Sequence, residues 1–154
     1  MRATVRWAVH SMPHSVLIVD DSHVVRRVMR DFFERRTDWK IGGEAEDGEE
    51  AIQKAKQLKP DLILLDFSMP NMNGIEAASE LKKILPDVHI IVFTMFGDAL
   101  GSTLSSAVGV DLVIPKAEGL TVLVDAVQQL IGTSEPNRSK ARADQQGPSA
   151  TEQD

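Results

Sequence analysis

Apolar residues in this chain gather in short runs separated by longer amphipathic segments. The runs are rich in Val, Ile and Leu and are too short for typical helices, so they predict strands buried on both faces of a parallel sheet. They cover residues 16–19, 62–65, 89–93 and 112–114, and a weaker run containing glycine at 39–46 predicts an edge strand. The hydrophobic pattern therefore predicts five strands.

The segments between the strands mostly show a helical period. Helices are expected from the cap at Ser22 to 36, from the cap at Asp47 to 58, at 75–85 and at 118–131. Segment 96–108 is rich in Gly, Ser and Thr, so any helix there should be short and easily rearranged. The apolar face expected for the first helix consists of Val24, Val25, Val28, Met29, Phe32 and Phe33, with most arginines, Arg26 among them, on the other side.

Alternation of strands and helices predicts one α/β domain with a doubly wound, five-stranded parallel sheet and helices on both faces. A flavodoxin-like strand order, 2-1-3-4-5, is the expected topology. We assign residues 15–132 to this domain, 1–14 to a disordered leader and 133–154 to a disordered polar tail. Met12 precedes the first strand directly, so translation starting there is an alternative to Met1.

Composition narrows the function. The formal net charge of −6 disfavours direct binding to nucleic acid or to a membrane surface, and no apolar run reaches the length of a membrane span. The chain has no cysteine, which excludes disulfides, thiolate metal sites and a cysteine nucleophile, and suits a cytoplasmic location.

Polar side chains follow four of the predicted strands. Asp20 and Asp21 follow the first, Asp66 the third and Lys116 the fifth, whereas Thr94 ends the fourth. The carboxyl ends of parallel strands share one edge of the sheet, where α/β proteins bind ligands. In the expected order the acids of the first strand lie about 5 Å, one strand spacing, from Asp66.

Three carboxylates this close repel one another, and a hard divalent cation such as Mg²⁺ relieves that repulsion. Asp66 could then act as a carboxylate nucleophile in phosphoryl transfer, with Thr94 and Lys116 contacting the phosphoryl oxygens. Each residue also has a structural explanation as a cap, a turn residue or a surface lysine. Their occurrence together at matching strand ends favours one shared site.

The sequence resembles response-regulator receiver domains of bacterial two-component signalling, chemotaxis regulators among them, over about residues 15–132. The resemblance rests on the motifs 19–22 (VDDS), 65–70 (LDFSMP) and 72–74 (MNG), with Thr94 and Lys116. It implies that Asp66 accepts a phosphoryl group from the phosphohistidine of a sensor kinase or phosphotransfer protein. It implies direct Mg²⁺ ligation by Asp21, Asp66 and the backbone carbonyl of Ser68, with Asp20 helping, often through water.

Two departures from the family pattern stand out. Val113 occupies the switch position, three residues before the lysine, where the family commonly has Tyr or Phe. Ala117 follows Lys116 where the family often has proline, so no cis peptide bond is expected there. The aromatic part of the usual switch is therefore missing, and the signal must travel otherwise.

The expected function is that of a single-domain response regulator, not an enzyme beyond slow loss of its own phosphate. Phosphorylation should change protein binding at the face built from the fourth helix, fifth strand and fifth helix, without direct contact to nucleic acid. Two alternatives stay open: a magnesium-dependent aspartyl-phosphate phosphohydrolase, and an adaptor that works without phosphate.

Overall fold

The computed structural model describes residues 14–95 and 109–132. Their strands form one parallel sheet in the order β2-β1-β3-β4-β5, which confirms the predicted topology. The strands are β1 (Ser15–Val19), β2 (Lys40–Ala45), β3 (Leu62–Leu65), β4 (His89–Thr94) and β5 (Leu112–Pro115). Helices make the first three connections between successive strands, as a parallel sheet requires.

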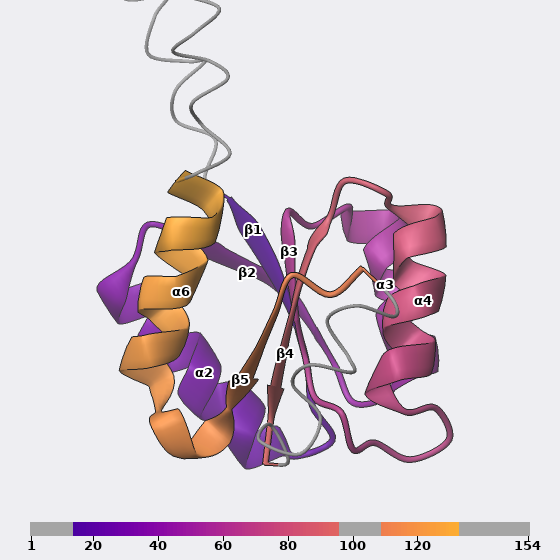
Figure 1. Ribbon diagram of the computed structural model, residues 1–154, viewed down its shortest axis with the longest axis horizontal. Helices are drawn as coiled ribbons and strands as arrows, with labels where there is room; N and C mark the ends of the chain where they lie inside the picture. The colour runs from indigo at the N-terminus through magenta and orange to yellow at the C-terminus, as the bar shows by residue number, and fades with distance from the viewer. Residues whose placement is uncertain (1–13, 96–108, 133–154) are drawn as a thin grey trace, which may run out of the picture.

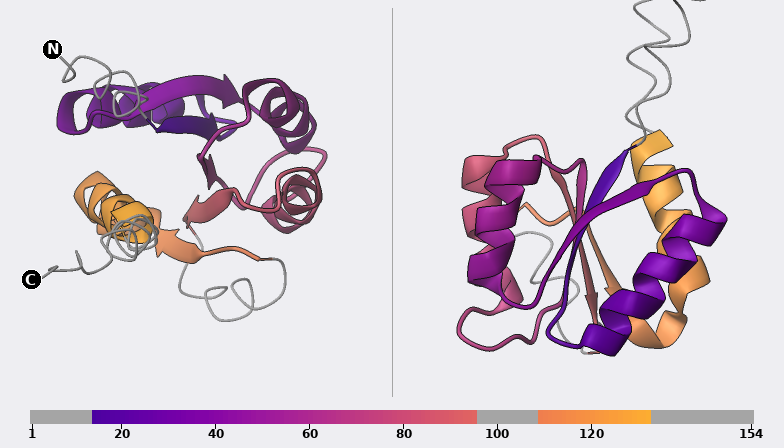
Figure 2. Two further views of the ribbon diagram at one scale, coloured as in Figure 1. Left: turned by 90° about the horizontal axis from the view of Figure 1, so that it is seen from above. Right: turned by 180° about the vertical axis from the view of Figure 1, so that it is seen from behind.

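Four α-helices and one short 3₁₀ helix complete the described part of the fold. They are α2 (His23–Arg36), α3 (Gly48–Leu58), α4 (Gly74–Ile84), η2 (Lys116–Glu118) and α6 (Leu120–Gly132). Helices α2 and α6 cover one face of the sheet and α3 and α4 the other (Figure 1; Figure 2). The fourth helix expected from the sequence, in 96–108, lies outside the described residues, as do 1–13 and 133–154.

The core divides along the strands because successive side chains point to opposite faces. Ile18, Leu64 and Ile91 pack toward α2 and α6, while Val19, Leu65 and Val92 pack toward α3 and α4. All six are essentially inaccessible to water. A rigid, buried centre of the sheet therefore holds the ends of β1, β3 and β4 in fixed positions.

Burial of all five strands is not observed. Strands β2 and β5 lie at the edges of the sheet, and each contains exposed residues, Lys40 and Gly42 in β2 and Leu112 in β5. An edge strand has a neighbour on one side only, so the uniform burial seen in β3 is not available to it. The last helix also begins later than expected, because η2 separates it from β5.

The apolar face expected for α2 is only partly correct. Met29 and Phe33 are buried and Val25 and Phe32 are partly buried, but Val24 and Val28 are 68% and 49% exposed. The expected set of six residues covers more of the helix circumference than one sheet face can bury. The Ser22 cap is confirmed, since its side chain accepts a hydrogen bond from Val25 N.

Candidate functional site: an acidic group at the carboxyl ends of β1 and β3

Three carboxylates meet where β1 and β3 end. These strands pair in parallel register through Val19 and Leu65, so the next residues, Asp20 and Asp66, leave the sheet side by side. Asp66 N donates to Val19 O at 2.9 Å, which continues the ladder one step further. One oxygen each of Asp20, Asp21 and Asp66 lies within 4.8 Å of the others.

The acids differ in burial. The Asp20 and Asp66 side chains are 3% and 7% exposed, whereas Asp21 is exposed to solvent. The pKa of Asp66 is raised to about 6, chiefly by burial and also by the charges of Asp20 and Asp21, against the lowering effect of Lys116 and of the Ser68 backbone. At neutral pH Asp66 is therefore largely ionised, and its charge is costly to maintain.

Lys116 supplies a positive charge to this group. Its Nζ lies 2.7 Å from Asp20 Oδ2 and 3.7 Å from Asp66 Oδ1, with 15% of the side chain exposed. The lysine follows β5, so its side chain spans the ends of β4 and β3 to reach the acid that follows β1. Asp20 Oδ1 accepts a hydrogen bond from Ser22 N at 2.9 Å. Both oxygens of Asp20 are thus already engaged.

The other residues predicted for the site lie on β4, on β5 and in the loop after Asp66. Thr94 ends β4, next to the strand of Asp66, and is fully buried. Ser68 is exposed in the loop after Asp66. Val113 pairs with Val92 across the sheet and is partly buried against the α3 and α4 side of the core. The described residues contain no cis peptide bond, in agreement with the expectation for Lys116 and Ala117.

The loop from Asp66 to Gly74 is closed by backbone contacts. Gly74 N donates to Phe67 O at 2.8 Å, and Asn73 caps α4 by accepting from the amides of Ile75 and Glu76. A Cβ atom on Gly74 would lie 2.7 Å from Asp66 O and 2.8 Å from Phe67 Cα. The backbone of the central acid therefore touches the start of the next helix, and only glycine permits that approach.

Arg26 is a neighbour of the site that the sequence pattern did not single out. Periodicity placed it on the polar side of α2, yet its side chain is 12% exposed and donates from Nη1 to Asp20 O at 2.6 Å. The signal available in the sequence was its place about one turn into α2, which begins at His23 directly after the acids and their Ser22 cap.

Known proteins are similar to this chain in sequence and in fold. Residues 16–128 match the model of the response regulator receiver domain, which covers most of the chain. The chain belongs to this family. The receiver domain is 37% identical over 118 residues to the response regulator protein VraR of Staphylococcus aureus, a match covering 77% of this chain and 56% of VraR. The chain thus spans about half the length of the curated relatives it matches.

Solved structures give the same fold. The response regulator domain of Thermotoga maritima CheB has a TM-score of 0.70 and 32% identity, covering 77% of this receiver domain and 96% of that chain. A Borrelia burgdorferi CheX-CheY-BeF3-Mg²⁺ complex matches with a TM-score of 0.69 and 28% identity, covering 78% and 90%. The resemblance inferred from the motifs is confirmed, and with it the place of this chain in two-component signalling.

The donor set of the receiver domain fits a hard divalent cation. All three side chains offer carboxylate oxygens, which is the ligand type that Mg²⁺ takes, and the group is open to water at Asp21. The buried part of the group already attracts a cation, since Lys116 lies against Asp20. Asp20, Asp21 and Asp66 are therefore the side chains that would hold Mg²⁺.

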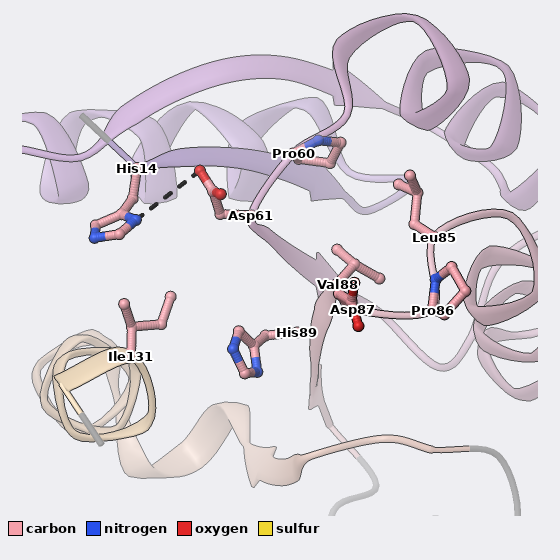
Figure 3. Close-up of a pocket in the computed structure, with 9 residues that line it drawn as sticks. All are labelled: His14, Pro60, Asp61, Leu85, Pro86, Asp87, Val88, His89 and Ile131. Atoms are coloured by element: carbon pink, nitrogen blue, oxygen red, sulfur yellow. Dashed lines mark ion pairs between the residues drawn. The ribbon is translucent and has the colours of Figure 1, made fainter. Parts of the chain in front are cut away.

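A hollow at the amino ends of the strands is separate from this group. It has a volume of about 300 Å³ and lies where β3 and β4 begin, between the ends of α4 and α6 (Figure 3). His14 and Asp61 form an ion pair of 4.0 Å on one side of it, and His89 and Ile131 point into it. No residue of the acidic group lines it.

Each helix formed by the described residues is too short or too polar to cross a bilayer.

Proposed function

We propose that this receiver domain takes a phosphoryl group onto Asp66 from the phosphohistidine of a sensor kinase or phosphotransfer protein. The observation that carries the proposal is the buried Asp66 carboxylate, which shares one small volume with two further acids and has Lys116 Nζ at 3.7 Å. A similar protein of Borrelia burgdorferi was solved in a complex with BeF3 and Mg²⁺, which supports phosphoryl and magnesium chemistry for a protein of this fold.

In the proposed reaction an Asp66 oxygen forms the new P–O bond while the P–N bond of phosphohistidine breaks, and its electron pair returns to the imidazole. No general base is required, because a carboxyl group with a pKa of about 6 is already ionised at neutral pH. A bound Mg²⁺ would neutralise charge on the acids and on the phosphoryl oxygens. Lys116 provides the second positive charge, and the buried Thr94 provides a hydroxyl at the end of the neighbouring strand.

Magnesium ligation is proposed for Asp20, Asp21, Asp66 and the backbone carbonyl of Ser68. Asp66 is the donor common to the metal and to the phosphoryl group, so the two functions meet at one side chain. The repulsion among three carboxylates is relieved when the cation binds, which is why their crowding favours binding. This assignment makes phosphoryl acceptance dependent on Mg²⁺.

The proposed output is a change in protein binding at the surface that contains β5 and α6. A phosphoryl group on Asp66 competes for Lys116, which now contacts Asp20 at 2.7 Å, and moving this lysine displaces the start of η2 and α6. Because Val113 occupies the usual aromatic switch position, no aromatic ring there can move in response to phosphorylation. A coupling of about 1–3 kcal/mol suffices to alter partner affinity. The negative net charge favours a protein partner over nucleic acid.

The test is incubation of the chain with a small acyl phosphate and Mg²⁺, followed by intact mass. We expect a single phosphoryl adduct that persists after the donor is removed and decays slowly, and that does not form in EDTA. Rapid turnover of the donor without an adduct would point instead to a phosphohydrolase. A chain that neither gains mass nor consumes donor would be a phosphate-independent adaptor, and the proposal would be wrong.

A further inference from the structure

The side chain of Arg26 is mostly buried beside the acidic group, at a cost in stability. Its side chain is 12% exposed, and its Nε lies 3.4 Å from Glu44 Oε1 without the alignment of a hydrogen bond. A buried N–H group that lacks a hydrogen bond destabilises the fold. In its buried position the guanidinium donates a hydrogen bond from Nη1 to the backbone carbonyl of Asp20, at 2.6 Å.

This contact completes the hold on the backbone of Asp20. Its amide donates to Ala45 O of β2 at 3.0 Å, and its carbonyl accepts from Arg26 of α2. The carbonyl belongs to the planar peptide unit that joins Asp20 to Asp21. A charged donor on that oxygen therefore fixes the plane from which the Asp21 side chain departs.

Asp21 needs such support more than the other two acids do. Asp20 is held by Ser22 N and Lys116, and Asp66 is buried and held by the Ser68 backbone. Asp21 is exposed, and within residues 14–95 and 109–132 no hydrogen bond or ion pair holds its carboxylate. The direction of this carboxylate is consequently set by its backbone.

We propose that Arg26 is a positioning residue for the metal site: it orients the peptide bond between Asp20 and Asp21 and so directs the Asp21 carboxylate toward Asp66. The inference rests on the magnesium site of the proposed function and adds to it a residue outside the ligand set. A group that orients a metal ligand commonly contributes about 10-fold to metal affinity.

Arg30 offers a matched control on the same helix. It bonds Glu44 Oε2 from Nε at 3.0 Å and from Nη2 at 2.8 Å, so it shares the ion-pair partner of Arg26. No hydrogen bond joins it to Asp20 among the described residues. Removing Arg30 thus weakens the packing of α2 on β2 without releasing the Asp20 carbonyl.

The experiment compares Arg26→Met with Arg30→Met in two measurements. Calorimetry gives the Mg²⁺ dissociation constant, and ¹⁵N relaxation in EDTA gives the order parameter of the Asp21 amide. For Arg26→Met we expect an increase of about 10-fold in the dissociation constant. We also expect a fall of the order parameter from about 0.85 toward about 0.6. Arg30→Met should change neither. Arg26→Gln, which is polar but too short to reach Asp20 O, should behave like Arg26→Met and is used if the latter does not fold.

Equal effects of the Arg26 and Arg30 variants, or none from the Arg26 variants, would overturn the inference. If the unmodified chain takes up no Mg²⁺, the magnesium part of the proposed function fails. The order parameter then decides the positioning role by itself, with a fall confined to the Arg26 variants supporting it and no fall refuting it.

Discussion

Aspartates have opposite roles at the two ends of the strands. Where strands begin, Asp61 and Asp111 each accept a hydrogen bond of 2.8 Å from a strand amide, Ser15 N and Ile90 N, and their side chains stay 52% and 27% exposed. Where strands end, Asp20 and Asp66 are 3% and 7% exposed and lie within 4.8 Å of each other and of Asp21.

The difference separates acids that stabilise the fold from acids that cost stability. Asp61 and Asp111 satisfy strand amides while they remain hydrated, so their charges cost little. Asp66 is buried among like charges, and its pKa is raised to about 6. An arrangement that weakens the fold persists where it serves a function, which here is the binding of a cation and a phosphoryl group.

Replacing one aspartate by asparagine at each end of the strands should give the largest difference in phosphorylation. Asp66→Asn is expected to abolish the phosphoryl adduct formed with an acyl phosphate and Mg²⁺, because the amide is not a carboxylate nucleophile. Asp61→Asn should form the adduct at the rate of the unmodified chain. Intact mass measured over time checks both. An adduct of full yield on Asp66→Asn would contradict the assignment.

The same Asp66→Asn variant should be more stable than the unmodified chain at neutral pH in EDTA, by about 1–3 kcal/mol. The folded pKa of Asp66 is about 6 against 3.8 without the fold. Between these values the folded chain retains a proton that the unfolded chain has lost. The stability due to Asp66 is therefore complete below pH 4 and is lost as the pH rises through about 6.

Urea unfolding of both chains at a series of pH values measures this effect. The difference in unfolding free energy should be small at pH 4, grow up to about pH 6–7 and stay constant above. Saturating Mg²⁺ should reduce it, because the cation stabilises the ionised carboxylate in the unmodified chain only. A difference in unfolding free energy that does not depend on pH would show that the fold does not raise the pKa of Asp66.

Gly74→Ala tests whether the loop of the acidic group depends on close backbone approach. The new Cβ would lie 2.7 Å from Asp66 O and 2.8 Å from Phe67 Cα, so we expect a loss of stability of about 1–3 kcal/mol together with weaker Mg²⁺ binding. Gly42→Ala is the control, since its Cβ would meet its nearest atom at 3.7 Å. Thermal unfolding and calorimetry separate the two variants, and equal losses would contradict the account.

Asp111→Ala should have the smallest effect. It removes the acceptor of Ile90 N at the starting edge of the sheet, which costs about 1 kcal/mol of stability. Mg²⁺ affinity and phosphorylation should not change, because the residue lies far along the strands from Asp66. A change in Mg²⁺ affinity measured by calorimetry would show that the two ends of the strands are energetically coupled.

Much of this arrangement could be predicted from the chain. Runs such as Leu62–Leu65 are apolar and too short for typical helices, which favours central strands. The order of the strands then brings Asp20 beside Asp66 without any knowledge of side chains. The capping of α2 by Ser22 also follows from residue type. These features depend on local pattern and on topology, which a sequence carries directly.

Features that depend on the rotation and packing of a helix were missed. Helical periodicity expected Val24 and Val28 to be buried and Arg26 to face water, whereas the two valines are exposed and the arginine contacts Asp20. The period fixes which residues share a face but not how wide a face the sheet covers. The engagement of Lys116 with Asp20 likewise depends on a long side chain reaching across two strands.

Borohydride trapping would test the central claim most directly. An aspartyl phosphate is reduced to homoserine, so tandem mass spectrometry of the chain treated with phosphodonor and Mg²⁺ locates the acceptor residue. We expect homoserine at position 66 alone, and none when EDTA replaces Mg²⁺. Homoserine at position 20, 21, 61 or 111, or at 66 irrespective of Mg²⁺, would contradict the account.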